Sequence, residues 1–411
     1  MAQPSSAQAA IAESSAFGLD RGEKLVVLTG GVMASLAITA ISAVLPTIDR
    51  ELAHSATDSM LVKQLVAGVT LAMVVGAPLG GFLIGRIGMR SVLLVATLIY
   101  TIAGTAGFYL ASLPALLASR LLLGAAAATI QVTSIVLINT RLSGNDRARW
   151  MGIHIALATL SALIINPLSG FLGSYDWRWP FLEYLIGAVL FVALLTVKDR
   201  AAPEVAVPVA GTTPVRGPSM LHWFPWHYLF LSLMVGAVTF IPTIYMPFLL
   251  RDEAGLSPGG IAAYLTLAGT VGGGVALMYG RARRVISVHG AFVFSFSLAG
   301  IGALVVGLAT ALPLLIAGGM VYSVGIAWLV ANMMTSLGSK VGPAQQGRAA
   351  GLVKAVHFSS APISVIMIEP FARTYGPHMV MLVAASLSFL VVVLMLVRIA
   401  RPARTIAPAR A

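Results

Sequence analysis

Long apolar stretches alternate with short polar segments along almost the whole chain. A helix that crosses a membrane core of roughly 30 Å needs about 20 apolar residues, and twelve stretches of suitable length occur. Charged residues, prolines and clusters of glycine separate them. The pattern therefore predicts an all-α membrane protein with twelve transmembrane helices.

The predicted spans divide into two groups of six, which indicates two six-helix halves. The first half is expected to occupy residues 24–197 and the second half residues 226–398. The segment between them, 198–225, is rich in proline, alanine and threonine, a composition typical of a linker. A polar tail, 1–23, and a basic tail, 399–411, complete the predicted organisation. The twelve spans are expected at 24–46, 60–84, 91–110, 114–139, 150–173, 179–197, 226–250, 258–279, 288–308, 312–337, 349–370 and 377–398.

The two predicted halves carry a weak sequence repeat. Three pairs of positions match at a nearly constant offset, and each lies at the same place in its half. Repetition of this kind indicates duplication of a six-helix unit. The matching pairs are Pro46 with Pro247, Gly85-Arg86 with Gly280-Arg281, and Arg149-x-x-Gly152 with Arg348-x-x-Gly351.

Composition excludes an ordinary soluble domain. The chain of 411 residues is 58% hydrophobic and only 10% charged, with a mean hydropathy of +0.93, whereas soluble domains are typically about 25% charged. It contains no cysteine, which excludes disulfides and thiol catalysis. The sequence also lacks a phosphate-binding glycine loop and metal-ligand spacing. We therefore expect neither an enzyme nor a bound cofactor or metal.

The basic residues predict the orientation in the membrane. Most of the 26 lysines and arginines fall on the side that also holds both termini. Because cytoplasmic loops are enriched in these residues, we expect both termini in the cytoplasm, with the protein in a plasma membrane such as the bacterial inner membrane. The first residues lack the pattern of a cleaved secretory signal, so the first span is expected to direct insertion. The net charge of +12 is spread over many loops, which argues against a nucleic-acid partner and favours contact with the lipid bilayer.

A glycine-rich helix end leads into a basic loop between the second and third predicted spans. Gly81 and Gly85 allow two helix backbones to approach closely in lipid. Arg86 and Arg90 favour the cytoplasmic side of the membrane. The full pattern, Gly81-x-x-x-Gly85-Arg86-x-Gly88-x-Arg90, resembles the signature loop of the major facilitator superfamily of secondary transporters.

Two further motifs extend this resemblance over nearly the whole chain. Arg120-x-x-x-Gly124 resembles the fourth-helix motif of the superfamily, and Asp176-Trp177-Arg178-Trp179-Pro180-Phe181 resembles a stretch common in its drug:proton antiporters. The resemblance implies two six-helix halves that alternate around a central site, with the signature loop as a cytoplasmic gate. It also implies a small-molecule substrate, coupling to protons and function as a monomer.

Two motifs depart from the superfamily's pattern. Gly85 stands where the signature loop usually has an acidic residue that helps to close the cytoplasmic side. The antiporter motif of the fifth helix is reduced to Asn166, Pro167 and Gly170. The gate is therefore expected to depend on its arginines rather than on an acid.

Arg120 lies inside the fourth predicted span, where a charge is costly and usually faces a cavity or a partner. At helical spacing it shares a face with Gly124, Ala127 and Gln131. We expect Arg120 to pair with a carboxylate, to hold an anionic substrate, or to favour the ionised form of a neighbouring acid. The structural alternative is a fixed ion pair or a clamp on backbone carbonyls.

Glu183 and Glu369 are the only carboxylates inside the predicted spans. Burial favours the protonated form of a carboxyl group and a nearby arginine favours the ionised form. A carboxylate that is alternately exposed and paired with Arg120 would therefore take up and release a proton. The alternative for both is an interfacial residue that is solvated or paired with Arg178 or Arg373.

Other polar residues in the spans are candidates for the substrate or proton pathway. His357 and Lys354 lie three positions apart in the eleventh span, and His154 lies in the fifth. Histidine titrates near neutral pH and is suited to carrying protons. The candidates to line an amphipathic pocket are Asn332, Gln64, Tyr245, Tyr264 and Trp328. Packing between helices is the alternative for each of them.

Glycines in the second and eighth spans are expected to support movement of the halves. The stretches 76–81 and 269–274 offer close contacts between helices, which we expect to join one half to the other. Ordinary small-residue packing is the alternative.

Three functions are consistent with the sequence. The first is proton-coupled efflux of a drug-like compound or secondary metabolite, which the antiporter-like motifs favour. The second is uptake or exchange of an anionic metabolite by proton symport, which Arg120, Lys63 and Lys354 favour because few acids accompany them. The third is a membrane-embedded sensing or interaction protein without transport.

Overall fold

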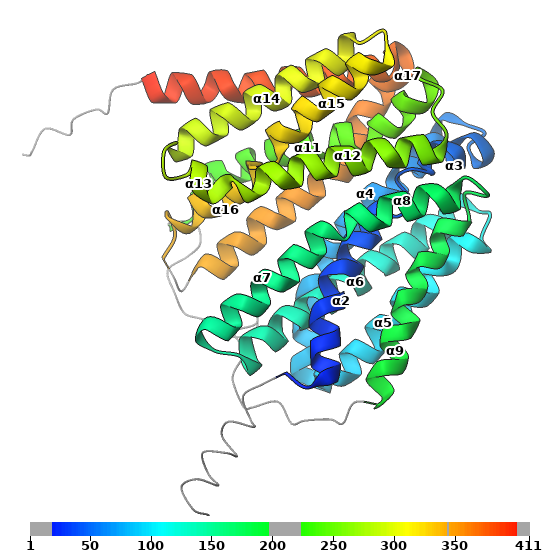
Figure 1. Ribbon diagram of the computed structural model, residues 1–411, viewed down its shortest axis with the longest axis vertical. Helices are drawn as coiled ribbons and strands as arrows, with labels where there is room; N and C mark the ends of the chain where they lie inside the picture. The colour runs from blue at the N-terminus through cyan, green and yellow to red at the C-terminus, as the bar shows by residue number, and fades with distance from the viewer. Residues whose placement is uncertain (1–18, 197–222, 343–344, 401–411) are drawn as a thin grey trace, which may run out of the picture.

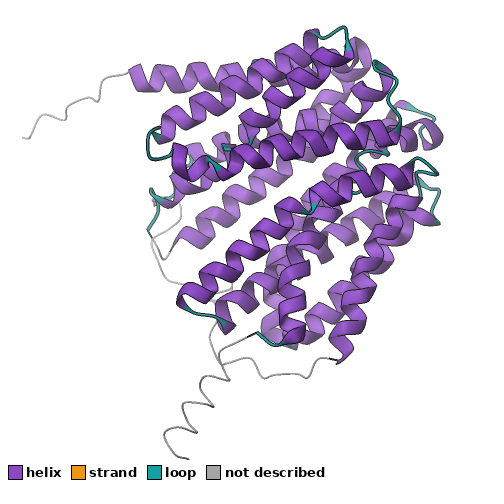
Figure 2. Cartoon of the chain, in the orientation of Figure 1, coloured by secondary structure: helices purple, strands orange, loops and turns teal. Residues whose placement is uncertain are grey.

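The computed structural model describes residues 19–196, 223–342 and 345–400, and within these ranges all regular secondary structure is helical (Figures 1 and 2). The helices form a bundle of two parts, which confirms the predicted all-α membrane fold. The predicted linker and the two predicted tails lie mostly outside the described residues.

The first part of the bundle contains α2 to α9 and two short 3-10 helices. Its elements are α2 (Arg21–Thr39), α3 (Leu45–Leu52), α4 (Ala56–Ile87), α5 (Met89–Thr105), η1 (Ala106–Phe108), α6 (Leu113–Arg141), α7 (Gly144–Leu160), α8 (Ala162–Gly173), η2 (Trp179–Leu185) and α9 (Ile186–Thr196).

The second part contains α11 to α17. Its elements are α11 (His227–Asp252), α12 (Pro258–Leu277), α13 (Tyr279–Ala282), α14 (Val288–Leu308), α15 (Leu312–Ile326), α16 (Leu329–Gly338) and α17 (Gln346–Ala400).

Each predicted span has a helical counterpart. In the described residues, ten helices are long and apolar enough to cross a membrane. The shorter apolar helix Trp179–Leu195 corresponds to the sixth predicted span. The last two predicted spans both lie in α17, which is 55 residues long. The short helix at the sixth span and the shared helix of the eleventh and twelfth spans together account for the difference between twelve and ten.

The backbone of α17 breaks at Gly376. This residue has φ 80° and ψ 171°, a conformation that favours glycine because a Cβ atom would be strained there. Pro377 follows and has no N–H group for the helical hydrogen bond. The two limbs of α17 are therefore joined by a single non-helical residue rather than by a loop.

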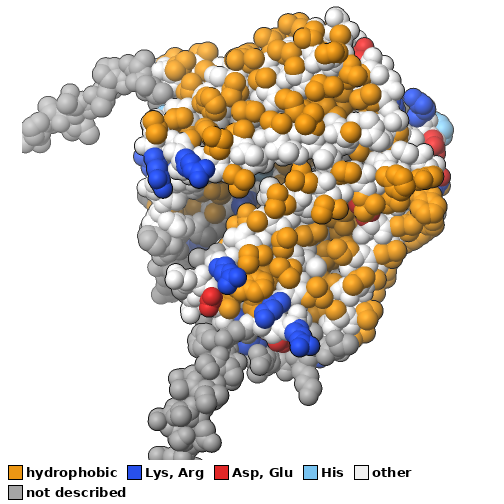
Figure 3. All heavy atoms as spheres, in the orientation of Figure 1, with side chains coloured by type: hydrophobic (Ala, Val, Ile, Leu, Met, Phe, Trp, Pro, Cys, Tyr) orange, Lys and Arg blue, Asp and Glu red, His pale blue; other side chains and the backbone are white. Residues whose placement is uncertain are grey.

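Basic residues gather at one end of the bundle, which we call the basic end. Figure 3 shows lysine and arginine side chains on this side of both parts. The chain enters α2 and leaves α17 at the same end (Figure 1). Residues in the polar segments here include Arg21, Arg90, Arg149, Arg281, Arg284 and Lys340.

Each part has its own hydrophobic core, and small residues bring its helices together. Within the first core, a Cβ atom on Gly76 of α4 would lie 2.5 Å from the Cα atom of Ala125 in α6. Gly272 of α12 meets Ser323 of α15 in the same way, whereas Gly269, Gly273 and Gly274 have no such neighbour within 4 Å. The close neighbours of Gly76 and Gly272 therefore belong to their own half, which agrees with the alternative of ordinary small-residue packing.

The two halves meet at the end opposite the basic end, which we call the closed end. There α4 packs against α17, α8 against α12, and α3 against α11. Among the described residues, the direct hydrogen bonds between the halves run from the middle of the bundle to this end. Figure 3 shows the surface hollowed between the halves toward the basic end. The bundle is therefore shut at the closed end and parted toward the basic end.

Candidate functional site

A buried ion pair joins the two halves at the closed end. Nζ of Lys63, on α4, lies 2.9 Å from Oε1 of Glu369, on α17. Only 8% of the lysine side chain and 3% of the glutamate side chain are exposed. Loss of one partner from a buried pair typically costs about 3–5 kcal/mol, because the remaining charge is left without compensation. The pair therefore favours the arrangement in which this end is shut.

Two further side chains donate hydrogen bonds to the carboxylate of Glu369. Tyr245 of α11 donates from its hydroxyl to Oε2 at 2.9 Å. Arg373, one turn along α17, donates from Nε to Oε1 at 3.1 Å. We call Lys63, Tyr245, Glu369 and Arg373 the closed-end cluster. When ionised, it holds two positive charges and one negative charge.

A proline in α17 supplies a second link between the halves. Pro362 has no N–H group, so the carbonyl of Phe358, four residues earlier, has no helical donor. The hydroxyl of Thr70, on α4, lies 3.0 Å from that carbonyl oxygen and donates to it. Gln64 donates to the carbonyl of Pro362 itself at 3.2 Å. The irregularity in α17 is therefore matched by polar groups of α4.

A cavity of about 360 Å³ has walls that include none of the four cluster residues. It is lined mainly by α11, α12 and α15, with Thr159 of α7 contributed by the other half. Met246, next to Tyr245 in sequence, lines it together with Tyr264 and Tyr322. Apolar walls with a few hydroxyl groups are typical of small-molecule sites of this size. Tyr264, a candidate from the sequence, is placed in this lining.

Arg120 is completely buried within the first half and clamps backbone carbonyls. Nη2 donates to the carbonyl of Gly104 at 2.7 Å and to that of Ala103 at 3.3 Å, near the end of α5. The guanidinium also lies over the rings of Phe181 and Tyr184, at 4.7 and 4.9 Å. A cation at the carboxyl end of a helix satisfies its last carbonyl groups and its dipole. The expected pairing of Arg120 with a carboxylate is not found among the described residues.

We expect Arg120→Met to lower stability without removing the pH dependence of transport. The change removes charged hydrogen bonds to two carbonyls, a loss of about 2 kcal/mol or more. Thermal melting of the purified protein would show the loss, and flux at several pH values would show the retained dependence. Unchanged melting with flux that no longer responds to pH would instead place Arg120 in the proton pathway.

Glu183 links two elements of the first half. Oε1 accepts a hydrogen bond of 2.7 Å from Ser169 of α8, and Oε2 is buried without a hydrogen-bond partner in the described part of the chain. Arg178 lies beside Asp176 instead, at 3.8 Å. Glu183 therefore does not belong to the closed-end cluster. Its partner Ser169 is nevertheless next in sequence to Gly170, which contacts the other half.

The fifth-helix motif lies in α8, at the contact between the halves. Asn166 is buried, and Pro167 lies inside the helix. A Cβ atom on Gly170 would lie 2.2 Å from the Cβ atom of Ala262 in α12. The surviving glycine of this motif is therefore what allows α8 and α12 to meet.

The remaining polar candidates are dispersed. His154 binds the carbonyl of Val27 through Nδ1 at 2.8 Å, and the amide of Asn332 donates to the carbonyl of Val288 at 2.9 Å. The contact of His154 lies within the first half, and that of Asn332 lies within the second half. His357 is buried beside the ring of Phe240, with centroids 5.3 Å apart.

Gln131 differs from these candidates. It is half-buried in α6, and its amide has no hydrogen-bond partner among the described residues. Because it is only half-buried, its amide is left available to a substrate.

The predicted gate lies at the basic end, where the halves are parted. Gly81 and Gly85 belong to α4, and Gly88 turns the chain into α5 with φ 81°. Arg86 stacks on Phe82 of its own helix. Arg90 donates to the carbonyls of Leu194 and Leu195 in α9, which belongs to the same half. In this conformation the arginines therefore hold their own half together.

We expect Gly85→Asp to favour closure of the basic end. No atom lies within 4 Å of a Cβ atom built on Gly85, so the carboxylate has room, and Arg348 and Lys354 near the start of α17 are cations it could meet. Because the chain has no cysteine, a single Gly351→Cys probe would report access through labelling. Slower labelling is expected, and an unchanged rate would contradict the prediction. Gly152→Asp, another open glycine on α7, is the control.

Sequence reasoning did not bring Lys63 and Tyr245 to Glu369. From the sequence, Lys63 is expected only as a cation for an anionic substrate, and Tyr245 only as a residue that lines a pocket. The only local signal is the spacing of Glu369 and Arg373, which are one helical turn apart. A further signal of the ion pair is that Lys63 and Glu369 lie at a similar depth in two different apolar spans.

These features define a class of protein. Apolar helices in two halves, contacts concentrated at one end and a cavity lined by both halves are the architecture of a multi-pass membrane transporter. Residues 27–292 match the model of the family described as Major Facilitator Superfamily. The chain belongs to this superfamily.

Individual relatives agree with this assignment. The chain is 31% identical over 187 residues to an uncharacterized MFS-type transporter, YhcA, of Bacillus subtilis, covering 44% of this chain and 34% of the relative. It is 30% identical over 155 residues to the multidrug resistance protein MdtM of Escherichia coli, covering 37% and 36%. The matching stretch thus spans only about a third of each curated relative.

The crystal structure of a D-xylose-proton symporter matches almost the whole fold. The TM-score is 0.76 at 16% identity, over 91% of this chain and 96% of the symporter. This likeness shows the fold, and the predicted major facilitator fold is confirmed.

Proposed function

We propose that this transporter exports an amphipathic, drug-like compound or secondary metabolite in exchange for protons. The observation that carries the proposal is the buried Glu369 between Lys63 and Tyr245, because this carboxylate forms an ion pair that joins the two halves. Similarity to a multidrug resistance protein supports the export direction. The substrate would bind in the cavity lined by Thr159, Tyr264 and Tyr322.

The orientation follows from the distribution of charge. If the basic end faces the cytoplasm, the structure is shut toward the outside and open toward the inside. Ionised Glu369 then holds the outer side shut through Lys63. Substrate bound from the cytoplasm favours opening of the outer side, which exposes Glu369 to external protons. A protonated Glu369 no longer pairs with Lys63, and release of that proton to the cytoplasm restores the pair.

Flux into proteoliposomes under an imposed pH gradient tests this proposal. Panels of lipophilic cations and of organic anions would be compared at the same gradient. We expect a lipophilic cation or neutral amphiphile to move against the proton gradient. Anion accumulation in the direction of proton flow would contradict export, and lack of flux with both panels would contradict the substrate class.

The surplus of positive charge in the closed-end cluster favours a second candidate, uptake of an anionic metabolite by proton symport. Lys63 and Arg373 share one carboxylate, so protonation of Glu369 would free two cations for an anion. Counterflow with a labelled organic anion, dependent on Lys63, would distinguish it. Export remains the leading proposal because the cavity that would hold the substrate is mainly apolar.

A further inference from the structure

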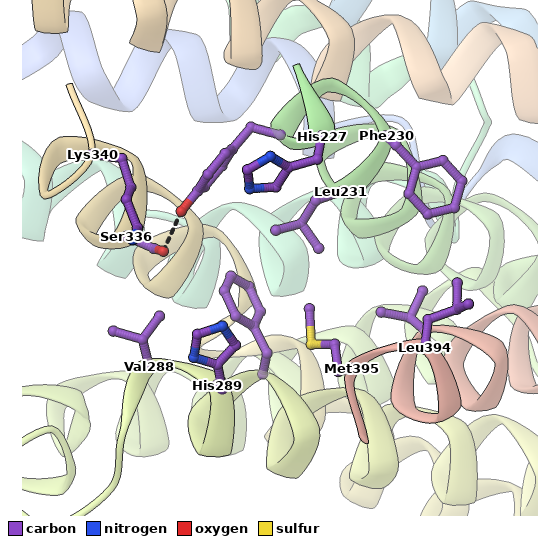
Figure 4. Close-up of a pocket in the computed structure, with 12 residues that line it drawn as sticks. His227, Phe230, Leu231, Val288, His289, Ser336, Lys340, Leu394 and Met395 are labelled. Carbon is purple, nitrogen blue, oxygen red and sulfur yellow. Dashed lines mark hydrogen bonds between the residues drawn. The ribbon is translucent and has the colours of Figure 1, made fainter. Parts of the chain in front are cut away.

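A second cavity, of about 510 Å³, lies within the second half at the basic end, away from the site described above. It is enclosed by the first turns of α11 and α14, the end of α16 and the last turns of α17. Figure 4 shows its polar and apolar residues at different places around the opening. None of these lining residues belongs to the closed-end cluster or to the contact between the halves.

One side of this cavity is polar and basic. Lys340, Ser336 and His289 lie on the same side of the cavity in Figure 4, and His227 lies beside Leu231. The ammonium group of Lys340 has no carboxylate within ion-pair distance in the described part of the chain, and none of the lining residues is acidic. The Ser336 hydroxyl is hydrogen-bonded to Tyr228, so Lys340 offers a positive charge and His289 a ring N–H group to an anion.

The other side of the cavity is apolar and reaches the surface. Phe230 and Leu394 lie there with Met395 close by (Figure 4). Phe230 is 49% exposed and Leu394 is 47% exposed, so this wall opens outward from the bundle. In a membrane-spanning helix such side chains contact acyl chains. The cavity thus joins a cationic pocket to a lipid-facing apolar wall.

We propose that this cavity binds an anionic phospholipid from the leaflet at the basic end. The phosphate group lies against Lys340 and His289, and one acyl chain lies along Phe230, Leu394 and Met395. Anionic headgroups fit because the lining carries basic and no acidic side chains, whereas the choline group of a zwitterionic lipid would lie beside the ammonium group of Lys340. The bound lipid connects the start of α11 to α14 and to the last limb of α17, and therefore stabilises the second half.

Native mass spectrometry of the full chain in neutral detergent tests this site. Phosphatidylglycerol and phosphatidylcholine with the same acyl chains would be titrated separately. We expect tighter retention of phosphatidylglycerol and a higher melting temperature in its presence, since a ligand that binds only the folded state stabilises it. Equal retention of the two lipids would overturn the proposal.

Variants separate this cavity from diffuse attraction to a basic surface. Lys340→Gln should weaken phosphatidylglycerol binding about fivefold, which corresponds to about 1 kcal/mol for one basic group near a membrane surface. Arg284→Gln removes an exposed charge at the same end outside the cavity and should leave binding unchanged. Met395→Trp should weaken binding of both lipids by filling the apolar wall.

Two results would contradict the assignment. An equal loss in Lys340→Gln and Arg284→Gln would show general electrostatic attraction rather than a site. Complete displacement of the lipid by inorganic phosphate would show a free-anion site in which the apolar wall plays no part.

Discussion

Glu369→Gln is expected to abolish proton-driven accumulation of substrate while exchange of substrate across the membrane continues. Glutamine preserves the size and part of the hydrogen bonding of the side chain but carries no charge and does not titrate near neutral pH. The ammonium of Lys63, only 8% exposed, then loses the partner that compensates its burial. A cost of about 3–5 kcal/mol would shift the balance away from the closed end by a factor of roughly 100 or more.

Two measurements on the same preparation report the loss of proton coupling and the opening of the closed end. Accumulation under a pH gradient, compared with counterflow at equal pH, measures coupling. Labelling of a Thr70→Cys probe measures opening of the closed end, because Thr70 is completely buried between α4 and α17 in the shut arrangement. We expect lost accumulation, retained counterflow and faster labelling. Full coupling in the variant would remove Glu369 from the proton step.

Two further variants distinguish the effect of the Lys63–Glu369 ion pair on closure from the effect of Glu369 on proton coupling. Glu253→Gln removes an exposed carboxylate at the same end and should behave as the unmodified protein. Lys63→Gln combined with Glu369→Gln removes both buried charges, so slow labelling should return while coupling stays lost. Recovery of coupling in the double variant would show that the proton binds elsewhere.

Gly170→Leu is expected to prevent closure of the end where α8 and α12 meet. Its Cβ atom alone would lie 2.2 Å from the Cβ atom of Ala262 and 3.1 Å from the carbonyl oxygen of Pro258, both closer than van der Waals contact allows. The helices must separate to admit the side chain. We expect transport to fall at least tenfold, with the Thr70→Cys probe labelled rapidly.

A compensating variant shows whether contact between the halves is the cause. Gly170→Ala should reduce transport, and Ala262→Gly should restore it, because it removes the methyl group that the new Cβ atom meets. Gly274→Leu, on α12 with no atom within 4 Å, is the control. A defect in Gly170→Ala that Ala262→Gly does not relieve would indicate damage to α8 itself.

The sequence contains enough information for the helices and for the superfamily, because apolar length and glycine-arginine spacing are local properties. It did not place the partners of its charged residues. Lys63 and Glu369 are 306 positions apart, and their contact depends on how two helices of different halves cross. Arg120 shows the same limit. The sequence predicts that it shares a helix face with Gly124 and Gln131, but it does not predict that the last carbonyl groups of α5 lie within its reach.

The glycines illustrate a related limit. A small residue in an apolar helix indicates that another backbone comes close, but it does not say which one. Gly76 meets α6 of its own half, whereas Gly170 meets α12 of the other half. Only the arrangement of the helices distinguishes packing inside a half from contact across the interface.

Gly376 has a mechanical consequence for the second half. Consecutive Cα atoms are about 3.8 Å apart, so a connection of one residue gives the two limbs of α17 no slack. When the limb that carries Glu369 leaves α4, the last limb must travel with it or rotate about Gly376. The last limb also carries Leu394 and Met395, which line the cavity at the basic end. If the two limbs move together, opening of the closed end therefore also displaces one wall of this cavity at the basic end.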